Sequence, residues 1–545
     1  MQRHPRALLS VLVVTLAASP FAQSPLVPAP VRAAAERITT EQVKTDLEFL
    51  ASDELKGRNT PSPGYDAAAE YIEKRLQRAG VKPLGDKGSY RQQYVMREST
   101  LAANDAAIAI GNASFPFGAG FTLRGFTGEL TTQPLRAVYV AHGWTADGID
   151  PYAGLDVKGK VVVVHGQNAR PRDAKIQQLG RVTVGGTSPV VEAERRGAVA
   201  VVYLFGPEPQ RGGAGAGGGR GAQPPTRREM EPAVLSAYSA PRITAIQLGE
   251  EATRALLDGS KLDAASLAEM ATSQNYPASF ELVPRIAIRL PATSVVHRPF
   301  NVVGLVEGTD PALKDQYLVV QSHLDGAVGS RTVENDAIYN SADDNASGSA
   351  ANISLAEQMM TARPRRSVIF VWDSGEEQGL WGTRHFVGTP PVALQKIVAM
   401  INIDMIGAIR IPTSPDANEQ RVTGPNEVFL IGPGVLSDRA LELIDRVNDQ
   451  YLKLTLNRQH DTPASEFFYP RTDAGPYLER GILTIGFTTG IHDRYHLPAD
   501  EAKTLDASKI AAIAKTVFVI VHALGQTDER PAIEKPLPAS VLKVK

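Results

Sequence analysis

The chain has 545 residues, of which 43% are hydrophobic and 21% charged, and its formal net charge is −2. This composition is that of a folded protein with a large core, and it offers no excess positive charge for binding nucleic acid or an anionic membrane. The chain contains no cysteine, which excludes disulfides, a thiol nucleophile and a cysteine zinc site, so any metal must be bound by His, Asp and Glu.

The N-terminus has the features of a secretory signal. Basic residues precede the apolar run Ala7–Val14, and small residues follow it at Ala17–Ser19. The run is short compared with the roughly 20 residues that cross a membrane. We therefore expect a cleaved signal peptide over residues 1–22 and no stable membrane insertion afterwards; a retained anchor is the alternative. The protein is expected to be exported, either periplasmic or secreted.

Two helices are expected next. Residues 23–35 are rich in Pro and Ala and are expected to be disordered. Apolar residues then recur at helical spacing over Val43–Leu50, after a capping Thr40. A second helix is expected from about Gly64 to Ala79, and it should end at Gly80, which suits a left-handed cap.

From about Phe126 to Pro284 the pattern changes to short β-branched runs typical of strands. These runs are Ala137–Val140, Lys160–Val164 and Ala198–Tyr203. The segment 206–232 contains the tract RGGAGAGGGRGAQPP, which cannot bury enough apolar surface to offset its ordering entropy, so we expect a disordered surface loop. A Gly/Arg segment that binds nucleic acid is the alternative, but its arginines are few and no aromatic residues are interleaved.

Strand and helix patterns alternate from Asn301 onwards. Strands are expected at 301–306, 316–321, 367–372, 397–403, 428–431 and 483–487. Helices are expected at 346–360, 379–386, 437–451 and 507–524. Such alternation predicts an α/β fold with a mixed, mostly parallel sheet flanked by helices, and ligands bind at the carboxyl ends of the strands in such folds.

Polar residues follow these apolar runs. His323 and Asp325 follow the second strand, Asp373–Glu377 the third and Asp404 the fourth, while Asp343–Asp344 opens a helix. Acidic residues gathered at one edge would repel one another without a cation, and a pair of divalent metal ions removes that repulsion. Zinc is favoured because it binds His nitrogen and carboxylate oxygen and keeps a position open for water.

Five motifs stand in the order found in the co-catalytic di-zinc aminopeptidases: SHLDG, SADDNASGSA, DSGEEQGLWGT, INIDMIG and YHLPADE. The chain resembles this family, which includes aminopeptidase Y, bacterial leucyl aminopeptidases and glutamate carboxypeptidases. The segment LASDELKGRNTPSPGYDAAAEYI resembles the opening of its larger exported members. The stretch containing GLDVKGKVVVVHG resembles the protease-associated domain that those members carry as an insertion.

The resemblance implies a division of the chain. A catalytic domain with the zinc exopeptidase fold would comprise residues 38–125 and 285–527. The protease-associated domain would be inserted over residues 126–284, and residues 528–545 would form a C-terminal tail.

The resemblance also implies two zinc ions per chain and their ligands. One ion would be bound by His323 and Asp404, and the other by Glu377 and His496. Asp343 would bridge the two ions, and the family has a cis peptide bond after this residue, here Asp343–Asp344.

Two adjacent glutamates are expected to share the chemistry, with Glu376 as the general base and Glu377 as a ligand. Glycines on both sides suit a turn, in which neighbouring carboxylates can reach one site. Asp325 would be the carboxylate that fixes the ring of His323. Gly326 departs from many relatives, which have a His there, but it is not one of the five ligands, so we expect no loss of metal.

The substrate pocket is expected to include Asp473, because its segment RTDAGPY resembles the family's Ser-Asp-His segment. Tyr477 is a candidate for stabilising the oxyanion, and Arg494 is a candidate for binding a terminal carboxylate. His492 and His496 lie at helical spacing and offer an alternative two-His zinc site. A proline two residues after His496 breaks any helix there, so we prefer His496 alone.

By resemblance, the activity is release of N-terminal amino acids from peptides, through attack of metal-activated water. A carboxypeptidase or dipeptidase of the same fold is one alternative, and it would need basic residues for a terminal carboxylate. A related glutaminyl cyclase would be expected to work with one metal. A non-catalytic, receptor-like binding module is a further alternative, which the intact ligand set and Glu376 disfavour. The sequence predicts no particular oligomeric state.

Overall fold

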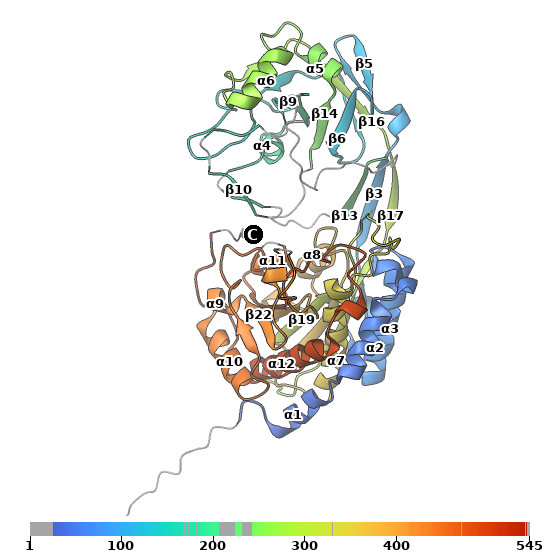
Figure 1. Ribbon diagram of the computed structural model, residues 1–545, viewed down its shortest axis with the longest axis vertical. Helices are drawn as coiled ribbons and strands as arrows, with labels where there is room; N and C mark the ends of the chain where they lie inside the picture. Colours follow the sequence, from blue (N-terminus) through green and yellow to red (C-terminus); the bar gives the residue numbers. More distant parts are fainter. Residues whose placement is uncertain are drawn as a thin grey trace, which may run out of the picture.

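The computed structural model describes residues 25–539, except 167–168, 173–174, 180–181, 185, 206–223, 232–241, 330, 416, 418 and 470, together with residue 541. The predicted signal peptide and residues 206–223 of the predicted Gly-rich loop lie outside the described residues. Figure 1 shows two lobes joined by a narrow group of strands. The large lobe contains the long helices and a broad sheet, and the small lobe contains two further sheets.

The large lobe is built on a nine-stranded sheet with the order β1-β18-β20-β19-β21-β24-β22-β23, in which β2 also pairs with β18. The four central strands β20, β19, β21 and β24 are parallel, whereas β18 and β22 run antiparallel to their neighbours β20 and β24. This arrangement confirms the predicted mixed, mostly parallel sheet. The bounds are β1 Lys82–Pro83, β2 Arg91–Gln93, β18 Phe300–Val306, β19 Tyr317–His323, β20 Ser367–Asp373, β21 Ile397–Ile403, β22 Glu427–Ile431, β23 Thr455–Asn457 and β24 Leu483–Thr488.

Helices cover both faces of this sheet because its central strands are apolar on both sides. Leu318 and Val320 of β19 belong to the core under α7 and α12, while Val319 between them packs with Phe386 of α8 on the other face. The helices are α1 Ala29–Glu36, α2 Thr40–Leu50, α3 Pro63–Ala79, α7 Gly348–Met359, α8 Trp381–Gly388, α9 Pro433–Leu436, α10 Asp438–Asp449, α11 Ala474–Leu478 and α12 Ala507–Gln526.

Helix α12 is long and apolar enough to cross a membrane by length and composition alone. However, 78% of its most apolar window is buried inside the fold. It contacts α1, α2, α7 and α10 in the large lobe. The apolar character of α12 is therefore explained by its position in the core of the large lobe.

The N-terminal helices differ in part from expectation. Helix α3 ends at Gly80 with φ 78°, as predicted. The cap of α2 is Thr39, whose side chain accepts the N–H of Gln42, and not Thr40. Residues 23–35 were expected to be disordered, but Ala29–Glu36 forms α1, because Val31, Ala34 and Ala35 make an apolar stripe that is buried against the core.

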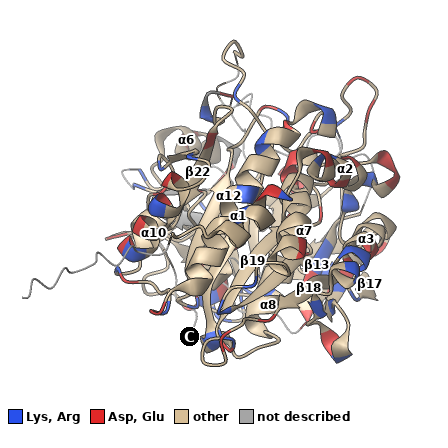
Figure 2. Ribbon diagram, turned by 90° about the horizontal axis from the view of Figure 1, so that it is seen from below, with Lys and Arg blue, Asp and Glu red and all other residues tan. Residues whose placement is uncertain are grey.

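Surface charge on the large lobe is mixed. In Figure 2, acidic and basic residues alternate around α2, α3 and α10. Ion pairs one helical turn apart account for part of this pattern: Lys44–Glu48, Lys74–Glu70 and Arg446–Glu442. Such exposed pairs contribute little to stability, and they keep the surface polar.

The small lobe contains a six-stranded sheet, β15-β8-β9-β12-β14-β6, and a four-stranded sheet, β5-β4-β16-β7. Its strands are β4 Ala107–Ile110, β5 Ala113–Pro116, β6 Phe121–Gly125, β7 Leu130–Thr131, β8 Ala137–Tyr139, β9 Val161–Val164, β12 Ala200–Tyr203, β14 Thr244–Leu248, β15 Phe280–Glu281 and β16 Ile286–Leu290. It also contains the hairpin of β10 Gln177–Leu179 and β11 Val182–Val184, with helices α4 Pro189–Arg195, α5 Glu250–Leu256 and α6 Ala264–Ser273.

The small lobe extends beyond the predicted boundaries of the inserted domain, residues 126–284. Strand β4 pairs with β16, and β6 pairs with β14, so residues 107–125 and 286–290 belong to this lobe. The physical reason is a shared core, in which Ile108 and Ile110 are buried together with Ile286 and Ile288. The small lobe is therefore larger than the predicted insertion, and the domain division and the protease-associated identity of the lobe remain predictions.

Three antiparallel strands lie between the lobes and are called here the bridge sheet: β13 Thr226–Glu231, β3 Val95–Leu101 and β17 Ala292–His297. Strand β13 falls inside the segment 206–232 that was predicted to be a disordered loop. The prediction is wrong for residues 226–231, because charged residues of β13 find partners on β3. Arg228 pairs with Glu98, and Glu231 pairs with Arg97.

Candidate metal centre

The carboxyl ends of three parallel strands carry the first residues of the site. Strand β19 ends at His323 and β20 at Asp373, and Asp404 follows directly after β21. These strands are neighbours in the order β20-β19-β21 and run parallel. Their carboxyl ends therefore lie along one edge, which is where open α/β sheets bind ligands.

Two groups of potential metal ligands lie at this edge, and both contain Asp344. In the first group, His323 Nε2 lies 3.0 Å from Asp344 Oδ1 and 3.4 Å from Asp404 Oδ1. In the second group, His496 Nε2 lies 3.0 Å from both Asp344 Oδ2 and Glu377 Oε2. The ligand atoms of each group lie within 4.8 Å of one another. Each carboxylate oxygen of Asp344 thus faces one group.

Asp343, the bridging carboxylate expected from the sequence, lies outside both groups. Its Oδ1 accepts the N–H of Gly407 at 2.7 Å, and its Oδ2 accepts that of Ala408 at 3.2 Å. The cis peptide bond is also one residue later than predicted, at Asp344–Asn345. The predicted position of the cis bond is therefore wrong by one residue. The bridging assignment remains a prediction, and the geometry favours Asp344 because the Asp343 side chain faces the loop after β21.

Asp500 supports this segment from behind, a role that the sequence did not indicate. Its carboxylate accepts the N–H of Asp343 at 3.0 and 3.1 Å and that of Asp344 at 3.2 Å. His492 also belongs to the support, since its Nε2 lies 3.4 Å from Asp343 and it is in neither ligand group. Asp500 stands in the motif YHLPADE, four residues after His496, and this position is the sequence signal that could have identified it.

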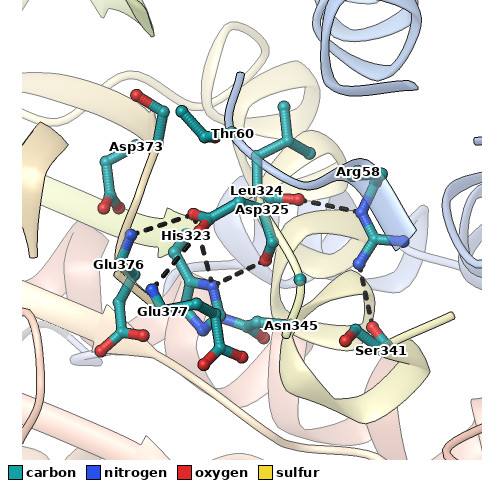
Figure 3. Close-up of polar contacts among 12 residues, drawn as sticks. Arg58, Thr60, His323, Leu324, Asp325, Ser341, Asn345, Asp373, Glu376 and Glu377 are labelled. Carbon is teal, nitrogen blue, oxygen red and sulfur yellow. Dashed lines mark hydrogen bonds and ion pairs between the residues drawn. The ribbon is translucent and has the colours of Figure 1, made fainter. Parts of the chain in front are cut away.

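Asp325 positions the two glutamates. Its carboxylate accepts the N–H of Glu376 at 3.1 Å and that of Glu377 at 3.4 Å, as Figure 3 shows. His323 Nδ1 bonds to the backbone carbonyl of Asp325 at 3.0 Å, whereas the carboxylate is 4.0 Å away. The backbone of Asp325 therefore orients the ring, and its side chain holds the segment Ser374–Trp381, called here the glutamate turn.

The glutamate turn has a compact local structure. The carbonyl of Glu376 accepts the N–H groups of Gly379 and Leu380, each at 2.9 Å. Gly375 has φ 70°, and a Cβ there would lie 2.6 Å from Cε3 of Trp381, so only glycine fits. The predicted turn is therefore present and allows both carboxylates to leave the backbone toward the same edge (Figure 3).

Gly326, where many relatives were expected to have a His, also sits in a close approach. A Cβ at this position would lie 2.5 Å from the carbonyl oxygen of Gly57 and 2.6 Å from Cβ of Ser341. A larger side chain would push apart two segments that pack behind the ligand groups.

Electrostatics at the site reflect concentrated negative charge. Burial raises the pKa of Glu376 well above its usual value, and the charge on Glu377 adds to this effect. Burial and the charge on Asp344 raise the pKa of Glu377 to about 7. Burial lowers the pKa of His496, but its contacts with Asp344 and Glu377 outweigh burial and raise it to about 10. In each case, protons offset part of the carboxylate charge that a metal cation would neutralise.

The donor set fits zinc. The two groups offer two imidazole nitrogens and three carboxylates, which are common zinc ligands. Asp404 Oδ1, Glu377 Oε1 and His496 Nε2 are buried atoms that have no hydrogen-bond partner among the described residues outside the two ligand groups. Buried polar atoms without partners are unfavourable, and a metal ion would satisfy all three.

Arg58 lies fully buried behind the ligand groups, and the sequence analysis missed it. Its guanidinium donates to the carbonyls of Leu50, Leu324, Asn340 and Ser341, and Figure 3 shows the bonds to Leu324 and Ser341. Burial lowers its pKa to about 10, while the surrounding carboxylates oppose that change. Arg58 thus joins the end of α2 to two loops of the site. Its only sequence signal is its place in the motif LKGRNTPSPGY.

The predicted pocket residues differ in their surroundings. Asp473 is 1% exposed and accepts a hydrogen bond from Thr383, and burial raises its pKa to about 6. Tyr477 is fully buried, and its hydroxyl donates to Gln321 at 2.7 Å, which is a structural contact and disfavours the oxyanion role. Arg494 lies 2.9 Å from Asp493, whose charge offsets its own.

Tyr495 adjoins the second ligand group and was not predicted. Its ring stacks on the imidazole of His496, with centroids 3.7 Å apart. Arg471 donates to the Tyr495 hydroxyl at 3.0 Å and to Glu466 at 2.9 Å. This chain of contacts orients the half-buried His496 toward Asp344 and Glu377.

An apolar cavity of about 40 Å³ opens beside Asp404. Met405 and Phe487 line it, together with Phe467 and Phe468. Small size and apolar walls suit an uncharged side chain placed next to the first ligand group.

Residues 301–521 match peptidase family M28. A curated aminopeptidase of Pseudomonas aeruginosa is 28% identical over 197 residues, which cover 36% of this chain and 32% of that protein. A probable zinc metalloprotease of Pyrenophora tritici-repentis is 27% identical over 165 residues, covering 30% of this chain and 34% of that protein. The matched segment thus spans about a third of the length of these relatives.

Among solved structures, an aminopeptidase from Aneurinibacillus sp. strain AM-1 is similar over 95% of this chain and 100% of its own, with a TM-score of 0.54 and 17% identity. This likeness establishes the fold. The family match covers β18 to α12, and so includes every residue of the two ligand groups and the glutamate turn.

Proposed function

We propose that this chain, of which residues 301–521 match peptidase family M28, is an aminopeptidase that binds two zinc ions. The observation that carries the proposal is the pair of ligand groups that share Asp344. One carboxylate with an oxygen directed at each group is the arrangement that a bridged pair of ions needs.

In this proposal, His323 and Asp404 bind the first zinc ion, and Glu377 and His496 bind the second. Asp344 takes the bridging role that the sequence had suggested for Asp343, because it alone belongs to both groups. When bound, zinc supplies Lewis acidity, which polarises a substrate carbonyl and makes water a stronger acid.

Glu376 acts as the general base. Glu376 belongs to neither ligand group, whereas its neighbour Glu377 belongs to the second. The Glu376 carboxylate therefore lies beside the metal site and is not used as a metal ligand. In the metal-free protein, burial raises its pKa well above the usual value, and with zinc bound its ionised carboxylate would accept the proton of the attacking water. The same carboxyl group then donates the proton to the leaving amine.

The charges near the site favour a substrate with a free amino terminus. Asp473 belongs to neither ligand group, and its Oδ2 is buried without a hydrogen-bond partner among the described residues, so it is the candidate for attracting an α-ammonium group. The arginines of this region have partners: Arg494 pairs with Asp493, and Arg471 pairs with Glu466. A carboxypeptidase would instead need a cation for the terminal carboxylate. The cavity beside Asp404 would accept an apolar side chain of the N-terminal residue.

The proposal is tested with purified protein and a panel of chromogenic substrates. Leucine p-nitroanilide should be cleaved, whereas its N-acetylated form and substrates with only a free carboxyl terminus should not. Removal of metal with a chelator should abolish cleavage, and two equivalents of zinc per chain should restore it. Full activity with one equivalent would contradict the two-ion site, and preferential cleavage of the carboxyl-terminal substrates would contradict an aminopeptidase.

We also propose export, to the periplasm or outside the cell, on the strength of the N-terminal signal pattern. Expression of the full chain in a Gram-negative host, followed by fractionation and N-terminal sequencing, tests it. The expected product starts near residue 23 and lies outside the cytoplasm. An intact N-terminus in the cytoplasm would contradict it.

A further inference from the structure

The glutamate turn contacts the bridge sheet as well as the large lobe. The hydroxyl of Tyr94, just before β3, lies 2.9 Å from Oγ of Ser374 at the start of the turn. Arg228 of β13 donates to Oε1 of Gln378 at 2.8 Å. Gln378 is the residue directly after Glu377. The bridge sheet therefore reaches the backbone segment that carries both glutamates.

An apolar contact joins the same two parts. Met96 of β3 and Met230 of β13 form a buried cluster with Tyr94 and Trp381. Met96 and Met230 are opposite each other in the strand pairing. Trp381 in turn lies against Gly375, where there is no space for even a Cβ. A shift of the bridge sheet would therefore be transmitted to the turn through close packing.

Arg228 is held in place on both sides. Its Nε bonds to Glu98 on the neighbouring strand β3, and the side chain is 32% exposed. Gln378 donates from Nε2 to the backbone carbonyl of Thr60 in the large lobe. The chain Glu98–Arg228–Gln378–Thr60 thus crosses from the bridge sheet to the large lobe next to Glu377.

The bridge sheet is also the direct connection to the small lobe. Strand β3 is followed by β4, and β17 is preceded by β16, and both β4 and β16 belong to the small lobe. The opposite side of the glutamate turn is held by the Asp325 carboxylate. The turn is therefore clamped between the large lobe and the strands that carry the small lobe.

We propose that Arg228 and Gln378 are positioning residues that hold Glu376 and Glu377 in place from the bridge sheet. The small lobe then takes part in catalysis indirectly, because the position of the bridge sheet determines the positions of the base Glu376 and the ligand Glu377. This inference rests on the proposed function for its catalytic consequences, but the mechanical link itself is independent of it.

The test compares Arg228→Met with Arg227→Met. Arg227 is a matched control: it lies on the same strand, points to the other face, and pairs with Glu229 of β13. Amide hydrogen exchange of the peptide covering residues 374–381 is measured first. Arg228→Met should speed exchange of these amides by about tenfold or more, since their bonds open locally more often. Arg227→Met should leave it unchanged.

Kinetics and zinc content provide the second readout. Arg228→Met should lower kcat about ten- to a hundredfold, since small misplacement of catalytic groups has effects of this size. KM should change by less than about threefold, because the cavity beside Asp404 is untouched. Zinc occupancy should fall toward one equivalent, because Glu377 is displaced. Thermal unfolding of both variants controls for a general loss of stability.

A double-mutant cycle with Gln378→Met separates positioning from packing. If Arg228 acts through Gln378, the double variant should be no slower than the worse single variant. The inference would be overturned if the effects of Arg228→Met and Gln378→Met on kcat were fully additive. It would also be overturned if Arg228→Met and Arg227→Met had the same amide exchange rates and the same kcat. If the wild-type protein shows no peptidase activity but Arg228→Met still speeds amide exchange of the glutamate turn, the mechanical link is supported and the proposed function is refuted.

Discussion

Glu376 and Glu377 are adjacent in the chain but differ in their neighbours. Glu377 lies 3.0 Å from His496, whereas Glu376 belongs to neither ligand group. We expect Glu376→Gln to keep both zinc ions and to lower kcat at least 10²–10⁴-fold, the usual range for general-base catalysis. Glu377→Gln should lose zinc from the second group as well. Metal analysis and rates on both variants check this. Zinc loss in Glu376→Gln alone would reverse the two assignments.

Asp343 and Asp344 provide a second matched pair. Asp344→Asn should lose most bound zinc and all measurable activity, because both groups share this carboxylate. Asp343→Asn should retain zinc, but its weakened bonds to Gly407 and Ala408 should lower the free energy of unfolding by about 1–3 kcal/mol. Elemental analysis and urea unfolding measure the two effects. Zinc loss confined to Asp343→Asn would restore the bridging role to Asp343.

Zinc binding should depend on pH with a definite sign. Glu377, with a pKa of about 7, and His496, with a pKa of about 10, must both be deprotonated to bind metal. Both pKa values are raised, so folding of the metal-free protein takes up protons, and its stability falls as pH rises from about 4.5 to 7 because of Glu377 and from about 6.5 to 10 because of His496. Zinc should therefore raise Tm more at pH 8 than at pH 6. Calorimetry in buffers of different ionisation enthalpy should detect proton release on binding at pH 7; its absence would contradict these shifts.

At the scale of elements, Arg58 joins α2 to the loops after β19 and before α7. Arg58→Met would remove a donor from four buried carbonyls, of which that of Ser341 keeps the N–H of Ala346, and would remove a cation from behind the carboxylates. We expect the free energy of unfolding to fall by about 3–5 kcal/mol, the usual effect of breaking a buried charged network. Arg78→Met on the exposed side of α3 is the control, with little change expected. Denaturant unfolding of both variants measures this, and equal stabilities would refute the role of Arg58.

At the scale of the whole molecule, the Gly-rich tract and the bridge sheet should behave differently. Residues 211–222 lie outside the described residues, and their composition disfavours a packed role. Deleting them should leave turnover of small substrates within a few-fold, because β13 begins only at Thr226. Steady-state kinetics and circular dichroism of the shortened protein check this. Loss of activity in a folded protein would mean that the tract contributes to the site.

Local patterns were sufficient to predict much of this molecule. Apolar runs of strand length, separated by helical periods, predicted most elements from β18 to α12, because burial on both faces leaves an unbroken hydrophobic signal. The short elements α9, β23 and α11 were not predicted. The placement of His323 and Asp404 followed, since the polar residue after such a run lies at the carboxyl edge of the sheet. The resemblance to known motifs added His496 and the roles of the two glutamates, which remain proposals.

Tertiary structure decided the features that depend on direction or on distant partners. The backbone of one turn, packed against the loop after β21, determines whether Asp343 or Asp344 faces both ligand groups. A motif with two adjacent aspartates does not specify that backbone geometry. The limits of the small lobe depend on β4 and β16 pairing across more than 170 residues, because Ile110 pairs with Ile286. Arg58 and Arg228 matter through contacts with segments far away in the chain. Sequence patterns report local periodicity, whereas these contacts form only when the chain is folded.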